Sequence, residues 1–173
     1  MLVMKISEFA IKEKGSIDID WNEVEKHINF KLHDNVKDYF SRAFSNNSII
    51  GSVKFTEKDF IKPTGNKRND TWFSFNRCEG KVEFELEILK KAENAAFEIE
   101  NAFNIWTGGN DFGHRAMIGQ FYFNIGQILI LINNDTGKVE WLDCGYGYFD
   151  IYDENPNGIL ADDIQEFLNK LVK

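Results

Sequence analysis

Three side chains close together in the middle of the sequence have types that could support acid–base chemistry. Asp111, His114 and Arg115 are expected together in a loop flanked by glycines, where they could form a general base with a clamp for an anionic group. A catalytic histidine needs a partner that orients its ring, and a histidine in a loop more often bonds to the backbone. A hydrolase that uses these three residues is therefore the weaker alternative.

The other groups that could bind a metal or act as nucleophiles give weaker patterns. Asp162 and Asp163 could hold a metal ion, but adjacent residues on a helix face different directions, and acids at the start of a helix are explained by its dipole. Cys78 and Cys144 have no metal-ligand spacing with the three histidines, and no GxSxG, P-loop, HExxH or Rossmann fingerprint is present. We expect no enzyme activity, no bound metal and no cofactor.

The position of the net charge of -8 is the most informative feature of the composition. From Val139 to Asn169 there is no lysine, arginine or histidine, and the rest of the chain has as many acidic as basic residues. A nucleic-acid binder needs clustered lysines and arginines, so we expect no nucleic acid and favour a basic partner. The alternative is a solvated face without a partner. The acids of this run are Glu140, Asp143, Asp150, Asp153, Glu154, Asp162, Asp163 and Glu166.

A candidate contact surface for the partner lies in the same run, where aromatic residues alternate with acids. Tyrosine gives a large amphipathic contact area, and the centres of protein interfaces are enriched in it, whereas the acids would steer the approach. The alternative is that these aromatics only close the end of the sheet under the last helix. The predicted contact residues are Asp143, Tyr146, Tyr148, Phe149, Asp150, Tyr152, Asp153, Glu154, Asp162 and Asp163.

The stretch from Ile118 to Asp143 is expected to form the centre of the sheet on which these residues depend. Gln127 to Ile132 is an unbroken apolar run, which predicts an interior strand with both faces covered. Val139 to Trp141 alternates like a strand with one face in water. Asn133 to Gly137 has the composition of a hairpin loop, so the two strands should pair in antiparallel fashion.

Four segments have the apolar spacing of helices. Asp20 and Asp34 are placed to cap the first and second helices. The third helix is predicted from Lys90 to Trp106, and the last helix carries Asp162 and Asp163 in its first turns. Further strands are predicted at residues 49–56, 71–76 and 81–89, and a loop at 58–70. The buried face of the last helix is expected to hold Leu160, Ile164, Phe167, Leu168 and Leu171.

The length of 173 residues fits a single domain, residues 1–173, that buries its own core, with residues 1–19 as a weakly patterned N-terminal arm. The predicted elements make it an α+β domain with a mixed or mostly antiparallel sheet flanked by helices. No segment has the length and apolar character of a membrane span or a signal peptide. We therefore expect a soluble, cytoplasmic protein that does not bind a membrane.

Five segments, taken in order, form a pattern known from one protein family. They are Leu32 to Phe40 after a helix that bears a tryptophan, Ile118-Gly119, Gln127 to Ile132, Thr136 to Trp141, and Ile159 to Leu168. Together they resemble the SUKH superfamily over about Asp20 to Val172. The chain departs from the family pattern in three places: His33 stands where the family prefers proline, Val36 stands at an aromatic position, and Asn124 to Gln127 replaces a Gly-Gly-Asp-like turn.

The resemblance implies both a fold and a function. The superfamily has an α+β domain and includes yeast regulators of cell-wall synthesis and many bacterial immunity proteins, which bind and neutralise polymorphic toxins, often nucleases. It brings no catalytic residues. An immunity protein that binds a basic toxin domain is the leading hypothesis. A scaffold or regulatory domain with a cellular partner is the alternative, and the oligomeric state stays open.

Overall fold

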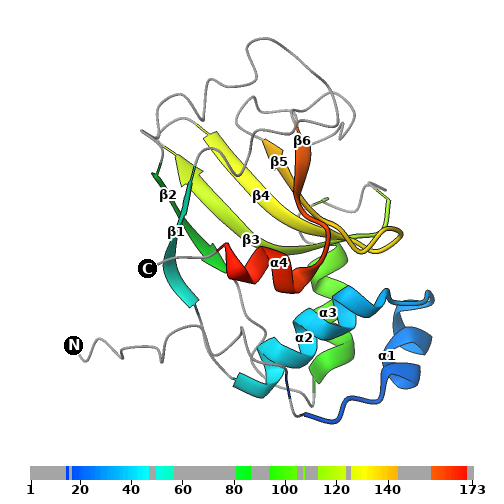
Figure 1. Cartoon of the computed structure of the whole chain (residues 1–173). Helices are drawn as coiled ribbons and strands as arrows, with labels where there is room; N and C mark the ends of the chain where they lie inside the picture. Colours follow the sequence, from blue (N-terminus) through cyan, green and yellow to red (C-terminus); the bar gives the residue numbers. More distant parts are fainter. Residues whose placement is uncertain are drawn as a thin grey trace.

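Four helices and a six-stranded sheet make up the part of the chain that the computed structural model describes, residues 15, 17–46, 50–56, 81–86, 94–104, 107, 113–123, 126–143 and 157–170. Figure 1 shows α1, α2 and α3 gathered below the sheet. In chain order the elements are α1 (Trp21–Ile28), α2 (Asp34–Asn46), β1 (Ile50–Thr56), β2 (Lys81–Leu86), α3 (Ala95–Asn104), β3 (Arg115–Phe123), β4 (Gly126–Asn133), β5 (Val139–Asp143), β6 (Asn157–Ala161) and α4 (Ile164–Asn169).

The six strands follow one another across the sheet in the order of the sequence, and each neighbouring pair is antiparallel. β4 lies between β3 and β5, with Ile130 opposite Trp141. The predicted interior strand and its antiparallel hairpin are therefore confirmed. The α+β fold class is confirmed as well, since an antiparallel sheet is flanked by helices.

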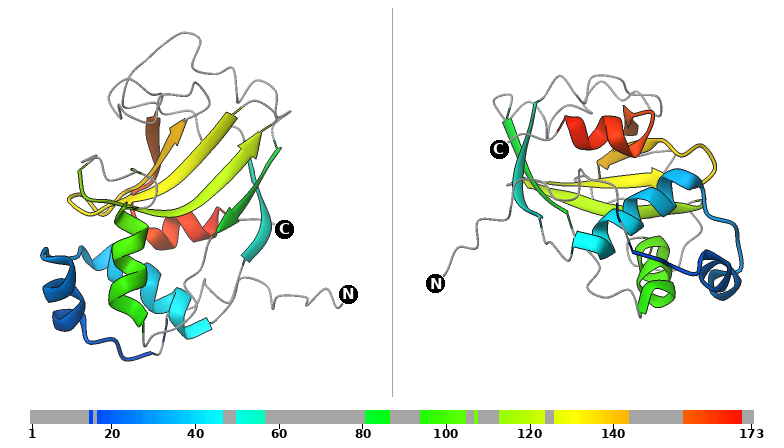
Figure 2. Two further views of the ribbon diagram at one scale, coloured as in Figure 1. Left: turned by 180° about the vertical axis from the view of Figure 1, so that it is seen from behind. Right: turned by 60° about the horizontal axis from the view of Figure 1, so that its bottom comes forward.

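The two faces of the sheet bury different sets of side chains. Side chains alternate along a strand, so Ile128, Ile130 and Ile132 of β4 share one face, where they join residues of all four helices in the main core. On that side α1 lies next to α3 (Figure 2). Leu129 and Leu131 point to the opposite face and form a smaller apolar cluster with residues of β3 and β5. Both faces of β4 are buried, as the unbroken apolar run predicted.

Every residue of β5 is buried, so the prediction of one face in water was wrong. The face that was expected in water holds Glu140 and Leu142. Leu142 packs with Leu129 and Leu131 in the smaller cluster, and Ile159 of β6 lies opposite Glu140. Glu140 can lie in this buried position because Arg115 and Asn133 donate hydrogen bonds to its carboxylate, at 2.8 and 2.9 Å.

The last helix begins at Ile164, later than predicted, because the preceding residues form β6. Ala161 still pairs with β5, and Asp163 is the N-cap of α4, where its side chain accepts a hydrogen bond from the backbone N–H of Glu166 at 2.8 Å. Asp162 and Asp163 thus precede the helix and do not lie in its first turn. The apolar positions Leu160, Ile164, Phe167 and Leu168 are buried as predicted, and Leu171 lies outside the described residues.

The first two helices differ in their caps. Asp20 caps α1 as predicted, since its Oδ1 accepts the N–H groups of Asn22 and Glu23, each at 3.1 Å. Asp34 was expected to cap α2, but it is the first residue of that helix, and the imidazole of His33 takes the capping position. β1, β2 and α3 lie within segments predicted as strand, strand and helix, whereas residues 1–14, 57–80, 87–93, 105 and 106 lie outside the described part.

Candidate functional site

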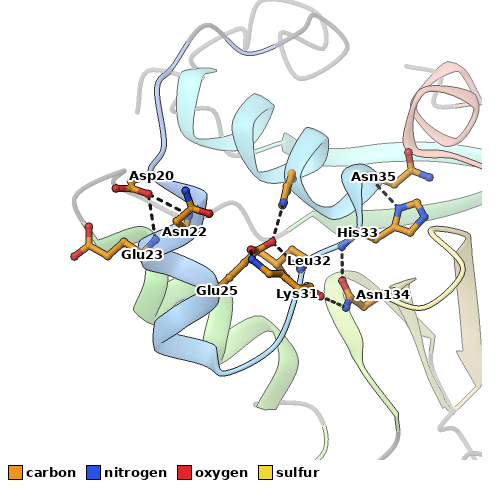
Figure 3. A network of polar contacts seen from close by, with 10 residues as sticks. Asp20, Asn22, Glu23, Glu25, Lys31, Leu32, His33, Asn35 and Asn134 are labelled. Carbon is orange, nitrogen blue, oxygen red and sulfur yellow. Dashed lines mark hydrogen bonds and ion pairs between the residues drawn. The ribbon is translucent and has the colours of Figure 1, made fainter.

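The segment between α1 and α2 is fixed by a buried carboxylate. The Glu25 side chain accepts hydrogen bonds from the backbone N–H of Leu32 at 3.0 Å and from the ammonium groups of Lys31 and Lys37 at 2.6 and 2.8 Å (Figure 3). Burial alone would raise the pKa of Glu25, but these three hydrogen bonds outweigh burial and lower the pKa to about 2. Glu25 is therefore charged in the folded protein and holds the start of α2 against α1.

The same segment is bound to the β4–β5 hairpin through Asn134. Its side-chain oxygen accepts the backbone N–H of His33 at 2.8 Å, and its amide nitrogen donates to the carbonyl of Lys31 at 2.7 Å (Figure 3). Its own backbone N–H donates to the carbonyl of His114 at 2.7 Å. One asparagine thus joins the start of α2, the hairpin and the start of β3 at one end of the sheet.

Two of the three residues of the hydrolase hypothesis lie at this end, and both make structural contacts. Arg115 is the first residue of β3, not part of a loop as predicted, and its Nε donates to Glu140. The His114 ring is stacked on Phe30, with 4.5 Å between the ring centroids, and its Nδ1 lies 4.0 Å from Asp135. Asp111 lies outside the described residues.

The acids between β6 and α4 combine exposure with structural roles. The Asp162 side chain is 76% exposed, and it pairs with Lys138 at 3.0 Å. Asp163 is also exposed but serves as the N-cap of α4. Glu166 accepts the backbone N–H of Asp162 at 2.8 Å, so the capping contacts extend one residue before the N-cap. Over the described ranges, no group of three or more histidine, cysteine, aspartate or glutamate side chains is arranged to hold a metal ion.

Asp143 does not belong to an exposed surface. It has 0% exposure at the end of β5, so its place in the predicted contact surface is corrected. The pairing of β5 with β6 puts Leu142 beside Asn157 and Val139 beside Ala161, so Asp143 and Asp162 lie at opposite ends of these strands. The other predicted contact residues, Tyr146, Tyr148, Phe149, Asp150, Tyr152, Asp153 and Glu154, lie outside the described residues.

Two lysines that flank the acidic run were missed as part of the site. Lys138 precedes the run and pairs with Asp162, while Lys170 follows it, lies 3.8 Å from Glu166 and donates to the carbonyl of Leu160. The spacing of Glu166 and Lys170, four residues apart on a helix, could have predicted the second pair. These contacts partly neutralise the acidic surface at the start of α4.

No family model and no curated protein matches this chain. Within the described residues, none of the helices has the length and apolar character needed to cross a membrane.

Proposed function

We propose that this protein is a non-enzymatic binding protein that neutralises a bacterial toxin domain in the cytoplasm by binding a basic surface of it. The observation that carries the proposal is the charge pattern, because the whole net charge of -8 falls in the run from Val139 to Asn169. Within this run, Asp162, Asp163 and Glu166 are exposed at the junction of β6 and α4. Exposed acids of one sign attract a basic partner and raise its rate of association.

The resemblance to the SUKH superfamily supports the choice of a toxin as the partner. Toxins that are nucleases must bind a phosphate backbone, which requires lysine and arginine on their surface. An acidic inhibitor surface would complement those side chains and compete with the nucleic acid. A scaffold with a cellular partner would use the same acids, so the identity of the bound protein separates the two hypotheses.

The contacts of the candidate chemical groups support binding over hydrolysis. The Nε of Arg115 donates to Glu140, and the ring of His114 is stacked on Phe30. Asp163 caps α4. Each of these side chains therefore has a structural task in the fold that needs no substrate.

The test is protection of cells by the protein. The partner would be captured from the host strain with the tagged chain, and the toxin encoded beside its gene would be expressed with and without it. We expect the captured protein to be that toxin, to carry a basic surface and to kill cells only when this chain is absent. Capture of an acidic cellular protein, or killing that continues when both proteins are present, would contradict the proposal.

A matched pair of variants tests the surface itself. Asp162→Asn removes an exposed acid of the run, and Asp135→Asn removes an exposed acid outside it, with side-chain exposures of 76% and 72%. Neither residue is a helix cap, so both variants should fold. We expect Asp162→Asn to slow association with the toxin domain more than Asp135→Asn does, and equal rates for the two would place the contact elsewhere.

A further inference from the structure

The N-terminus of α2 is capped by a histidine, unlike the N-termini of α1 and α4. The backbone N–H of Asn35 donates to Nδ1 of His33 at 3.1 Å. The carbonyl of His33 accepts the N–H groups of Val36 and Lys37, so His33 occupies the N-cap position with both its backbone and its ring. Asp20 and Asp163 fill the same position on α1 and α4 with a carboxylate.

This geometry specifies which nitrogen of His33 carries a proton. A backbone N–H can only donate, so Nδ1 must be the acceptor and the proton of the neutral ring must lie on Nε2. Protonation of the ring puts a hydrogen on Nδ1, directly toward the N–H of Asn35. The cap is then lost, and a positive charge stands at the positive end of the helix dipole. A carboxylate cap keeps its acceptor throughout the pH range in which imidazole titrates.

We propose that His33 is a pH-sensitive latch, which fixes the start of α2 to the β4–β5 hairpin when its ring is neutral and releases it when the ring is protonated. The hairpin is in direct contact with this cap. The side chain of Asn35 donates to the carbonyl of Gly137 at 2.8 Å, and the backbone N–H of His33 donates to Asn134. Loss of the cap therefore loosens a junction that includes both elements.

One side of the ring lies against the β4–β5 turn. Gly137 adopts φ of +72°, and a Cβ built on it would clash with Cε1 and Nδ1 of His33, so the glycine backbone approaches the ring closely. Any movement of the ring toward this side displaces the turn. This close packing couples the charge of one side chain to the position of the turn.

The charged groups around His33 do not compensate for the added proton. Lys31 and Lys37 on its own segment are bound to Glu25, and on the hairpin Asp135 lies next to His114 and Lys138 is paired with Asp162. Asp34 follows it in sequence and is exposed. Among the described residues, no carboxylate forms an ion pair with the His33 ring, so protonation removes the cap without adding an ion pair.

The contacts of His33 differ from those of the other two histidines. Because protonation removes the cap, the latch makes the folded chain lose stability as pH falls through the range where imidazole titrates. His27 lies 2.9 Å from Glu100 and His114 lies 4.0 Å from Asp135, so each of these rings faces a carboxylate instead of a backbone N–H. Both are therefore replaced in the experiment.

The experiment uses the full chain with His27→Gln and His114→Gln, in which His33 is the only imidazole, and the same chain with His33→Asn added. Asparagine caps helices well at any pH. Urea unfolding is measured at about pH 7.5 and about pH 5.5. The folding equilibrium constant of the chain that retains His33 should fall about 2- to 10-fold between these values. The lower figure is the least that a helix cap is worth, and the upper one is about the most that one imidazole can contribute over these two pH units. The chain with His33→Asn should lose this difference.

Two results would overturn the latch. One is an equal pH dependence in the two chains. The other, which needs no substitution at His33, is a nitrogen NMR spectrum of the wild-type imidazole that places the proton on Nδ1 at neutral pH. If the His33→Asn chain does not fold, the NMR result decides. Amide hydrogen exchange at Asn35 in the wild-type chain adds a second measurement, because the protection factor of this amide should fall at the lower pH.

Discussion

Glu140 on β5 accepts a hydrogen bond from the Nε of Arg115 on β3 at 2.8 Å, across the intervening strand β4. Asn133 of β4 donates to the other oxygen of the same carboxylate at 2.9 Å. Three adjacent strands are thereby joined by side chains on the face that does not carry the main core, next to the apolar cluster of Leu129 and Leu131. This polar group ties the β4–β5 hairpin to β3 at the end of the sheet where α2 begins.

Removing the carboxylate of this group should destabilise the fold. Glu140→Leu is expected to cost about 3 kcal/mol of unfolding free energy, because a buried ion pair loses one partner and Asn133 loses its acceptor. Replacing both partners, Glu140→Leu with Arg115→Met, should cost less than the sum of the single changes. A double-mutant cycle by urea denaturation measures this, and strictly additive costs would mean that the two side chains do not interact.

The second prediction concerns acid stability and Glu25. The pKa of its carboxyl is lowered from 4.5 to about 2 in the folded protein, so the folded state binds its proton less readily than the unfolded state. The resulting stabilisation is fully present above about pH 5 and is lost as pH falls through the folded pKa of about 2. The difference in unfolding free energy between the wild type and Glu25→Gln should therefore shrink between these two pH values.

Glu23→Gln is the control for that measurement, since Glu23 lies exposed on the same helix. Its difference from the wild type should stay nearly constant over the same range. A constant difference for Glu25→Gln as well would show that the two lysines do not hold the charged form of Glu25.

The third prediction uses two glycines with nearly the same backbone conformation. Gly113 and Gly137 have φ of +70° and +72°, so an alanine is strained at either position. At Gly137 the new methyl group would also meet the ring of His33 and the amide of Asn35, whereas at Gly113 it would meet only the guanidinium end of the Arg115 side chain. Gly137→Ala should therefore lower the melting temperature more than Gly113→Ala, and equal losses would contradict the close contact with His33.

The fourth prediction compares two phenylalanines on helices. Phe167 on α4 is fully buried, while Phe97 on α3 is 59% exposed. Phe167→Ala should cost about 3–5 kcal/mol of unfolding free energy, because it removes buried apolar area and leaves a cavity. Phe97→Ala should cost well under 1 kcal/mol, about the size typical of exposed positions. Similar costs for the two variants would mean that α4 does not pack on the core as described.

The parts of the fold that the sequence predicted are those with local signals. The run from Gln127 to Ile132 and the turn formers after it set the β4–β5 hairpin within a few residues of the chain. β6 was missed because Leu160 also fits the apolar spacing of the helix that follows. The strand depends on pairing with β5, and in that pairing Ala161 is opposite Val139, far away in sequence. Pairing between segments that are distant in the chain produces no periodic pattern in the sequence from which the strand could be predicted.

The candidate site shows the same limit. The acids of the run could be counted from the sequence, but their burial could not, because the charge of Glu140 is satisfied by Arg115, 25 residues away. The cap on α2 was assigned to Asp34 by residue type, since aspartate is a frequent cap and histidine is not. The position of His33 follows from its contact with the β4–β5 hairpin, which only the tertiary structure provides.

The last prediction separates the roles of acids and aromatics in the proposed contact surface, on residues that lie outside the described part of the chain. Replacing Asp150, Asp153 and Glu154 with Asn or Gln should slow association with the toxin domain and reduce its dependence on salt, because exposed charges act through a field that about 0.15 M salt screens within about 8 Å. Tyr148→Ala or Tyr152→Ala should instead raise the dissociation rate. If the ring is an interface anchor, the binding free energy should weaken by about 2 kcal/mol or more. Stopped-flow association and dissociation rates at two salt concentrations distinguish these effects. If both sets of variants bind and protect as the wild type does while remaining folded, the contact surface lies elsewhere on the protein.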